Sequence, residues 1–272
     1  MNWRWGLLIV LGIILTINTS CKKEEINVYP MIYGHAGTAL SSERAVYPPN
    51  SQASILYALD ALAAIGTEVD IQMTKDSVLV LFHDEFIELN NSAELTCIAE
   101  LTWGEIETFN EEEKYPIMRL SELVTIMRSN NKYVMLDLKH YNYCAEAYEN
   151  FEAFNWALNN ELAELQPDEK KRFTANSRNI DLLNTIECGE LQKSFETEKI
   201  PLAIDYSAAY DLDLIVIKLN ALTLEGATEL ENAGINYGLF GVKTKKEIKA
   251  TANFKPRMII SDNIAGTKAY YN

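Results

Sequence analysis

The sequence predicts an α/β protein built as a single (β/α)8 barrel of the TIM type, and three observations support this fold class. Short runs of β-branched and aromatic residues alternate with longer helical patterns from residue 28 onward, which is typical of βα units around a parallel sheet. No glycine-rich phosphate fingerprint follows any expected strand, which counts against a doubly wound nucleotide-binding sheet. Carboxylates and histidines also stand at strand ends, where barrels place functional groups.

The expected strands are short apolar runs, and the expected helices are the longer stretches between them. The strands are residues 31–36, 67–73, 78–82, 133–139, 173–176, 201–205, 214–219, 237–242 and 257–261. The helices are residues 51–65, 119–129, 144–164, 180–188, 222–233 and 245–252. Because these nine strands exceed the eight positions of a barrel, we expect one pair, around Lys75 and Asp76, to be a single strand extended by a turn.

The composition is that of an ordinary globular domain with a large core. Of the 272 residues, 48% are hydrophobic and 23% are charged, and a barrel of roughly 240 residues commonly forms one domain. The net charge of −15 argues against a nucleic-acid partner, because such proteins neutralise phosphates with cations. A ligand that carries phosphate would need a bound metal ion or a local cluster of basic residues.

Residues 1–20 have the layout of a secretory signal peptide, with an early Arg4 and an apolar run over residues 6–17. The segment that ends at Cys21 resembles a bacterial lipoprotein cleavage box, which implies lipidation of Cys21 and a membrane anchor. Residues 21–30 would form the lipidated tether and residues 31–272 the barrel, in the bacterial cell envelope. Lys22 favours the outer membrane, on its periplasmic or its exposed side. A plain signal peptide or an uncleaved anchor helix is the alternative.

The three other cysteines, Cys97, Cys144 and Cys188, are odd in number and lack CxxC spacing, which argues against a zinc site. One disulfide with a free thiol and three buried thiols both fit this count. We favour three buried thiols, since a free cysteine packs as a small apolar residue.

Carboxylates occupy two expected strands that should otherwise be apolar. Glu68 and Asp70 lie two residues apart, so their side chains share one face of strand 67–73, and Asp137 and Lys139 share a face of strand 133–139. Each pair alone would fit an ion pair or a solvent-facing strand edge. If both strands line one barrel, however, three carboxylates converge, and a divalent cation would relieve their repulsion. Oxygen ligands favour Mg²⁺ or Ca²⁺ over Zn²⁺.

The sequence contains three histidines, and two of them end expected strands. His35 stands among small residues at the end of strand 31–36, and His83 follows strand 78–82. Histidine suits proton transfer near neutral pH, so both are candidate catalytic residues. His140 lies in a polar stretch rich in tyrosine, and we assign it a structural role.

Several segments between residues 31 and 139 resemble the glycerophosphodiester phosphodiesterase family. They are Gly34-His35-Ala36-Gly37, Pro48-Pro49-Asn50-Ser51, residues 66–76, Phe82-His83-Asp84, residues 116–123 and Asp137-Leu138-Lys139. The resemblance implies a metal-dependent barrel enzyme that hydrolyses a small phosphodiester to glycerol 3-phosphate and an alcohol. It implies further that Glu68, Asp70 and Asp137 bind the metal, that His35 and His83 are the acid and the base, and that Asn50 and Lys139 contact the phosphate.

The chain departs from the family at three of these positions. Ala36 stands where the family has an arginine, Pro49 where it has glutamate, and Asp137 where it usually has the longer glutamate. Either Arg44, Arg178 or Lys218 replaces the missing phosphate contact, or the substrate differs. Two alternatives remain: a phospholipase C-like or D-like enzyme of the same superfamily that acts on membrane lipid, and a binding lipoprotein without catalysis.

Overall fold

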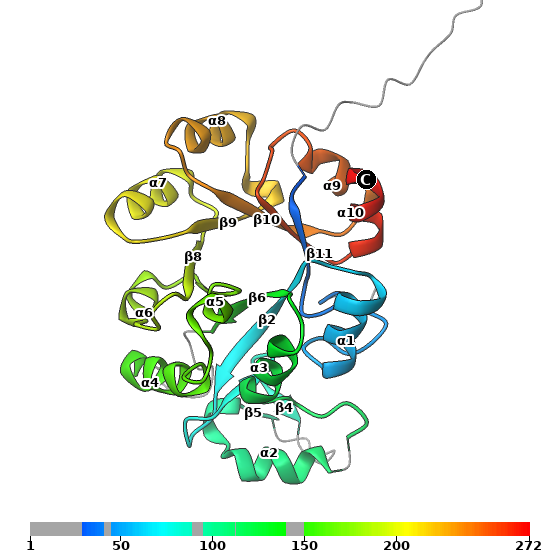
Figure 1. Cartoon of the computed structure of the whole chain (residues 1–272), viewed down its shortest axis with the longest axis vertical. Coiled ribbons are helices and arrows are strands. Elements are labelled where there is room, and N and C mark those ends of the chain that lie inside the picture. The colour runs from blue at the N-terminus through cyan, green and yellow to red at the C-terminus, as the bar shows by residue number, and fades with distance from the viewer. Residues whose placement is uncertain (1–28, 41–44, 89–94, 112, 140–149) are drawn as a thin grey trace, which may run out of the picture.

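Eight parallel strands form a closed barrel in the computed structural model, which describes residues 29–40, 45–88, 95–111, 113–139 and 150–272. In barrel order they are β1 (Met31–Gly34), β2 (Gly66–Met73), β6 (Tyr133–Leu138), β7 (Phe173–Ser177), β8 (Gln192–Glu196), β9 (Leu214–Lys218), β10 (Tyr237–Val242) and β11 (Met258–Ser261). The ring closes because β1 pairs with both β2 and β11. Figure 1 shows the helices packed around the outside of this ring. The predicted TIM-type barrel is confirmed.

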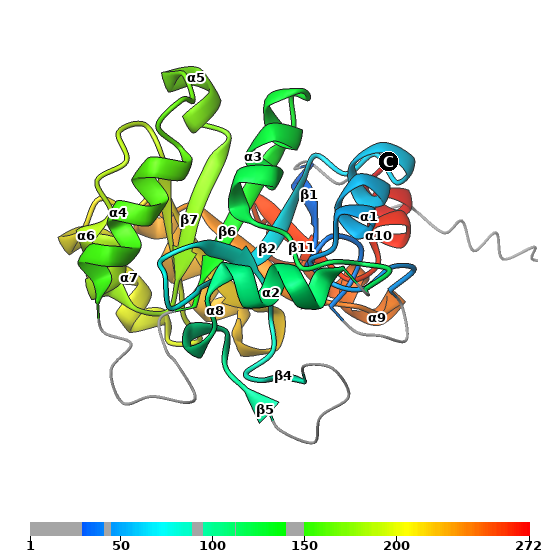
Figure 2. The same ribbon diagram turned by 90° about the horizontal axis from the view of Figure 1, so that it is seen from below.

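The turn expected at Lys75 and Asp76 extends one barrel strand into a hairpin. After this turn, β3 (Leu79–Leu81) pairs antiparallel with the end of β2 and does not belong to the closed ring. A small second hairpin follows, made of β4 (Ile87–Glu88) and β5 (Leu95–Thr96). Figure 2 shows this hairpin at the opposite end of the molecule from α5 (Pro167–Lys170), which directly precedes β7. The hairpin therefore lies on the side of the carboxyl ends of the barrel strands.

One predicted strand is wrong, and one barrel strand was not predicted. Residues 201–205 lie within α7 (Ile200–Ala209), whose first turn contains Pro201. A proline is tolerated there because the first N–H groups of a helix have no intrahelical partner. The missing strand is β8, whose sequence Gln-Lys-Ser-Phe-Glu is mostly polar although Ser194 and Phe195 are buried.

The other predicted helices form, with shorter bounds. They are α1 (Gln52–Leu56) with a π-helical turn at Tyr57–Ala61, α3 (Leu120–Arg128), α4 (Phe151–Glu161), α6 (Ile180–Thr185), α8 (Leu224–Asn232) and α9 (Lys245–Thr251). The start of the helix predicted at residues 144–164 lies outside the described residues. Besides α7, two helices of eight residues were not predicted, α2 (Trp103–Asn110) and α10 (Ile264–Tyr271).

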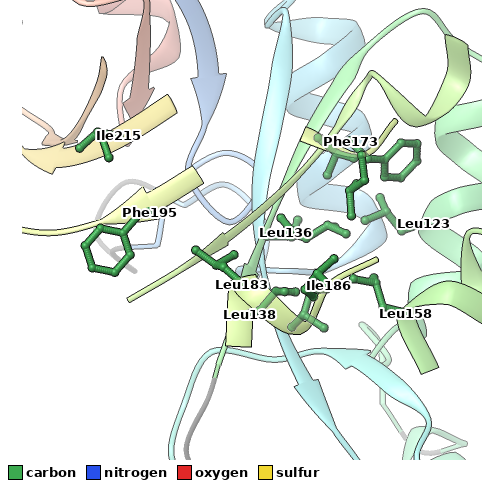
Figure 3. Packing of buried hydrophobic residues seen from close by; sticks show 14 of the residues in the cluster. Leu123, Leu136, Leu138, Leu158, Phe173, Leu183, Ile186, Phe195 and Ile215 are labelled. Atoms are coloured by element: carbon green, nitrogen blue, oxygen red, sulfur yellow. The ribbon is translucent and has the colours of Figure 1, made fainter. Parts of the chain in front are cut away.

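The main core lies between the barrel wall and the surrounding helices. Figure 3 shows Leu136 and Leu138 of β6 and Phe173 of β7 among side chains of α3, α4 and α6. Each buried Leu or Phe contributes about 1.5–3 kcal/mol. Because successive side chains of a strand alternate between two faces, Met135 and Asp137 point to the barrel interior. Met135 there packs with Tyr33, Val216, Met258 and Ile260.

The favoured interpretation of three buried thiols is wrong, because Cys97 is disulfide-bonded. Cys188 is a buried free thiol, so the alternative of a disulfide with a free thiol fits both described cysteines. Cys144 and the predicted lipidation site Cys21 lie outside the described residues. Within the residues that the structure describes, no helix combines the length and the apolar character needed to span a bilayer.

Candidate active site

A cavity of about 260 Å³ opens at the carboxyl ends of the barrel strands. Its polar lining consists of His35, Glu68, Asp70, His83, Asp137, Lys139, Asn176, Arg178 and Glu196. Leu40, Leu138, Phe240 and Ile260 supply its apolar lining. Both candidate histidines and all three candidate metal ligands therefore line one cavity, as the sequence predicts.

The three candidate metal ligands come from two neighbouring strands. Asp70 of β2 lies directly opposite Asp137 of β6 in the parallel pairing, and Glu68 precedes Asp70 on the same face. One carboxylate oxygen from each of the three lies within 4.8 Å of the others. Burial and the negative charge of Asp70 together raise the pKa of Glu68 to about 8. This is the response of a carboxylate group that lacks a sufficient counter-charge, so a hard divalent cation fits the site.

Lys139 lies between two of these carboxylates. Its Nζ is 2.7 Å from Asp70 Oδ1 and also contacts Asp137 Oδ2. Burial would lower the pKa of Lys139, but the charges of Asp137 and Asp70 outweigh it and raise the pKa. Burial alone would raise the pKa of Asp70, but the charge of Lys139 lowers this pKa below its ordinary value. Lys139 is therefore a fixed cation at the base of the cavity.

Asn50 holds Asp70 with both ends of its amide group. Its Nδ2 donates to Asp70 Oδ2 at 2.8 Å, and its Oδ1 accepts the backbone N–H of Asp70 at 3.0 Å. Asn50 adopts a left-handed backbone conformation with φ 60°, which asparagine tolerates better than most residues. Its side chain is buried next to Asp70, so the structure places it as a support for that carboxylate group.

The turn after β1 brings backbone donors to Glu68. The N–H of Ala36 donates to Glu68 Oε2 at 2.9 Å, and Ala36 itself has φ 48°. A Cβ atom at Gly34 would lie 1.8 Å from the carbonyl oxygen of Gly37, so the turn can close only with glycine at this position. This turn also sets the position of His35, which lies within it.

His35 is held by Asp262, a buried aspartate that directly follows the last barrel strand. Its Nδ1 lies 2.7 Å from Asp262 Oδ1, and its Nε2 lies 3.9 Å from Glu68 Oε2. Burial alone would lower the pKa of His35, but the hydrogen bond to Asp262 and the charge of Glu68 raise it to about 9. Asp262 also accepts the N–H of Leu40 at 3.2 Å, and its other oxygen lies 3.3 Å from Lys243 Nζ. Asp262 was not among the predicted site residues, although a carboxylate group directly after the predicted strand 257–261 was the available signal.

His83 also lines the cavity and is more exposed than His35. Its Nδ1 is 2.9 Å from Asp84 Oδ1, and 38% of its side chain is exposed. Gln72 of β2 fixes the backbone around it by donating to the carbonyl oxygens of Phe82 at 3.0 Å and Asp84 at 2.9 Å. The two histidines thus reach the cavity from the turn after β1 and from the segment after β3.

A second polar group lines the cavity at the ends of β7 and β8. Asn176 Nδ2 donates to Asp137 Oδ1 at 2.9 Å and to Glu196 Oε2 at 3.4 Å. Glu196 Oε1 accepts Arg178 Nε at 2.7 Å, and burial and the charge of Asp137 raise the pKa of Glu196. Sequence reasoning missed Asn176 and Glu196, the latter because β8 was not recognised.

The structure separates the three candidate replacements for the missing arginine, Arg44, Arg178 and Lys218, by their position relative to the cavity. Arg178 lines the cavity. Lys218 instead pairs with Glu198 at 3.6 Å and is not among the described residues of the cavity lining. Arg44 lies outside the described residues, as does His140.

A family model described as "Glycerophosphoryl diester phosphodiesterase family" matches residues 44–265 of the chain. No curated protein resembles the chain closely enough in sequence to count as a match.

Solved structures share the fold at low sequence identity. A phosphodiesterase from Oleispira antarctica, solved in complex with the product sn-glycerol-3-phosphate, has a TM-score of 0.74 at 18% identity, over 89% of this chain and 96% of its own. A glycerophosphodiester phosphodiesterase from Parabacteroides distasonis has a TM-score of 0.71 at 17% identity, over 90% and 97%. One from Agrobacterium tumefaciens has a TM-score of 0.69 at 17% identity, over 89% and 100%. The family model spans most of the chain and the barrel carries its carboxylates and histidines in one cavity, so the chain belongs to the glycerophosphoryl diester phosphodiesterase family.

Proposed function

We propose that this chain hydrolyses glycerophosphodiesters to glycerol 3-phosphate and an alcohol. The observation that carries the proposal is the convergence of Glu68, Asp70 and Asp137 with two histidines in one cavity. The family of the chain and the product bound by the Oleispira antarctica relative support this substrate class.

Glu68, Asp70 and Asp137 would hold a divalent ion, Mg²⁺ or Ca²⁺, because all three offer hard carboxylate oxygens. When bound, such an ion supplies Lewis-acid polarisation of a phosphoryl oxygen. Asn50 fixes the orientation of Asp70, and the N–H of Ala36 fixes that of Glu68. The ligand set is thus held in place by the chain before any substrate arrives.

The two histidines would transfer the protons. With Nδ1 of His35 bound to Asp262, its Nε2 is the ring nitrogen directed toward Glu68 and the cavity. His83 is the more exposed of the two histidines. One histidine would take a proton from the attacking water while the other protonates the oxygen of the leaving alcohol. Lys139 would stabilise charge on the nonbridging oxygens.

The test is release of glycerol 3-phosphate from glycerophosphocholine, glycerophosphoethanolamine and glycerophosphoinositol by the purified chain, with added Mg²⁺ or Ca²⁺ and with a chelator. We expect release that needs the metal and that falls by about 10²- to 10⁴-fold in His35→Ala and in His83→Ala. Circular dichroism of both variants controls for loss of the fold.

If a folded, metal-binding protein releases nothing from any of these substrates, the proposal is wrong. Phospholipid vesicles then become the next substrate, and a cyclic phosphate product would identify a phospholipase-like enzyme. Metal binding without turnover of either substrate would identify a binding protein.

A further inference from the structure

The charges around the cavity are poorly matched to an anionic substrate. Four carboxylates line it, namely Glu68, Asp70, Asp137 and Glu196. Among the described residues of the lining, the cations apart from histidine are Lys139 and Arg178. A bound divalent ion would offset two of the four negative charges. Each cationic side chain at the cavity therefore matters for the binding of a phosphodiester.

Lys139 is already engaged by two carboxylate groups. Its ammonium group lies between Asp70 and Asp137 and has only 16% of its side chain exposed. Arg178 differs, because 57% of its side chain is exposed whereas its partner Glu196 is only 11% exposed. The guanidinium group binds Glu196 Oε1 through Nε and one terminal nitrogen. The other terminal nitrogen of the fork makes no hydrogen bond to any described residue.

The backbone that carries Arg178 is firmly held. The preceding Ser177 is fully buried, and its hydroxyl group donates to the carbonyl oxygen of Leu138 at 3.0 Å. Glu196 is fixed in turn by Asn176, which also binds the candidate metal ligand Asp137. A continuous series of hydrogen bonds therefore links Asp137 to the guanidinium group of Arg178.

An ordinary surface ion pair is the simpler explanation of this contact, and such pairs contribute little to stability. Two observations count against it. The side chain of Glu196 is only 11% exposed, and both Glu196 and Arg178 line the cavity. The Arg128–Glu164 contact offers a comparison, since its glutamate is 86% exposed and neither residue is among those that line the cavity.

We propose that Arg178, oriented by Glu196, binds a nonbridging oxygen of the substrate phosphate. Arginine suits this contact because its planar fork presents fixed donors to phosphate oxygens and keeps its charge at any physiological pH. Glu196 occupies one edge of the fork and leaves donors of the other edge for the ligand. This inference rests on the proposed function. It adds a substrate contact directly after β7, whereas the sequence alone left Arg44, Arg178 and Lys218 as equal candidates.

The test compares Arg178→Ala and Arg178→Lys with Arg128→Ala, a matched control that removes an arginine paired with glutamate outside the cavity lining. The first measurement is kcat/KM for glycerophosphocholine, glycerophosphoethanolamine and glycerophosphoinositol. The second is the affinity for inorganic phosphate in the presence of Mg²⁺ or Ca²⁺, by titration calorimetry. We expect Arg178→Ala to lower both by about 10- to 100-fold, and by the same factor for all three substrates. Arg178→Lys should recover only part of the loss, and Arg128→Ala should match the wild type.

Two results would overturn the inference. In the first, Arg178→Ala matches Arg128→Ala in both measurements. In the second, only one of the three substrates is affected while phosphate affinity is unchanged, which would place Arg178 against the alcohol group instead. If the wild type hydrolyses none of the substrates, the proposed function fails separately. The phosphate titration still decides the role of Arg178 in that case, because it needs no turnover.

Discussion

At the scale of single residues, Asp262 is the side chain that fixes which nitrogen of His35 faces the cavity. It is completely buried and accepts both the ring N–H and the backbone N–H of Leu40 on one oxygen. A buried carboxylate group bound to Nδ1 holds an imidazole in one tautomer and one orientation. We therefore regard Asp262 as a positioning residue that acts through His35.

We predict that Asp262→Asn lowers kcat on the order of 10²- to 10⁴-fold with little change in KM, because substrate contacts remain while proton transfer is misaligned. The chain has only three histidines, so ¹⁵N-histidine labelling gives a simple spectrum in which the tautomer of His35 can be followed. The variant should shift His35 away from the Nδ1–H form. An unchanged kcat together with an unchanged tautomer would show that Asp262 is merely structural.

Residues of the cavity were predictable where polarity conflicts with the strand pattern. Glu68, Asp70 and Asp137 stand out in apolar runs, and the structure brings them together. Asn176 and Glu196 did not stand out, because their own strands are polar in sequence. Asn50 was singled out, but its two hydrogen bonds to Asp70 depend on a contact 20 residues away that spacing does not reveal.

At the scale of elements, local sequence patterns are again insufficient for residues 201–205. These residues were predicted as a strand but form part of helix α7. Seven of the nine expected runs became barrel strands because each is a short apolar segment between turns. The run at 201–205 is equally apolar, and a short apolar run does not distinguish a buried strand from a helix. In α7 only Ala203 is buried, while Phe195 of β8 packs against Tyr206 at 5.0 Å between ring centroids. Tertiary packing, which no local pattern contains, decides between the two.

Helix α9 offers a test of how a helix cap contributes to the stability of the protein. Thr244 caps its first turn, and Glu247 Oε2 accepts the backbone N–H groups of Thr244 at 2.7 Å and of Lys243 at 2.9 Å. We predict that Thr244→Ala lowers the free energy of unfolding by about 1 kcal/mol in urea titrations at neutral pH. Thr228→Ala, which removes an exposed hydroxyl group within α8, is the control and should have less effect.

The same cap predicts how the stability of the protein changes with pH. Burial would raise the pKa of Glu247, but its hydrogen bonds to Thr244 and Lys243 hold the pKa below its ordinary value. A carboxylate group with a lowered folded-state pKa stabilises the fold above its unfolded-state pKa, and this contribution disappears as pH falls through the folded-state pKa. Glu247→Gln should therefore destabilise the protein at pH 7 and cost less in acid. Equal costs at both pH values would contradict this assignment.

At the scale of the whole molecule, the parallel strands give the barrel two different ends. The chain enters β1 at Met31, at the amino ends of the strands, whereas the cavity lies at the carboxyl ends. If Cys21 is lipidated, as the sequence predicts, the described chain is joined to its anchor through Met31, at the end of the barrel opposite the cavity. The cavity would then open at the end of the barrel away from the point of attachment, where a water-soluble glycerophosphodiester can reach it.

This orientation can be tested with the native lipidated protein reconstituted on phospholipid vesicles, with Cys21→Ser as the control that lacks the lipid. Lipidation is checked by mass spectrometry and by binding to the vesicles. We expect both forms to hydrolyse soluble glycerophosphocholine at the same rate and neither to cleave the vesicle lipid, because β1 begins at the end of the barrel opposite the cavity. Cleavage of the vesicle lipid by the anchored form alone would show that the cavity reaches its own membrane. That result would contradict the orientation and favour a phospholipase-like activity, whereas a native protein without lipid would remove the anchor and leave the barrel chemistry untouched.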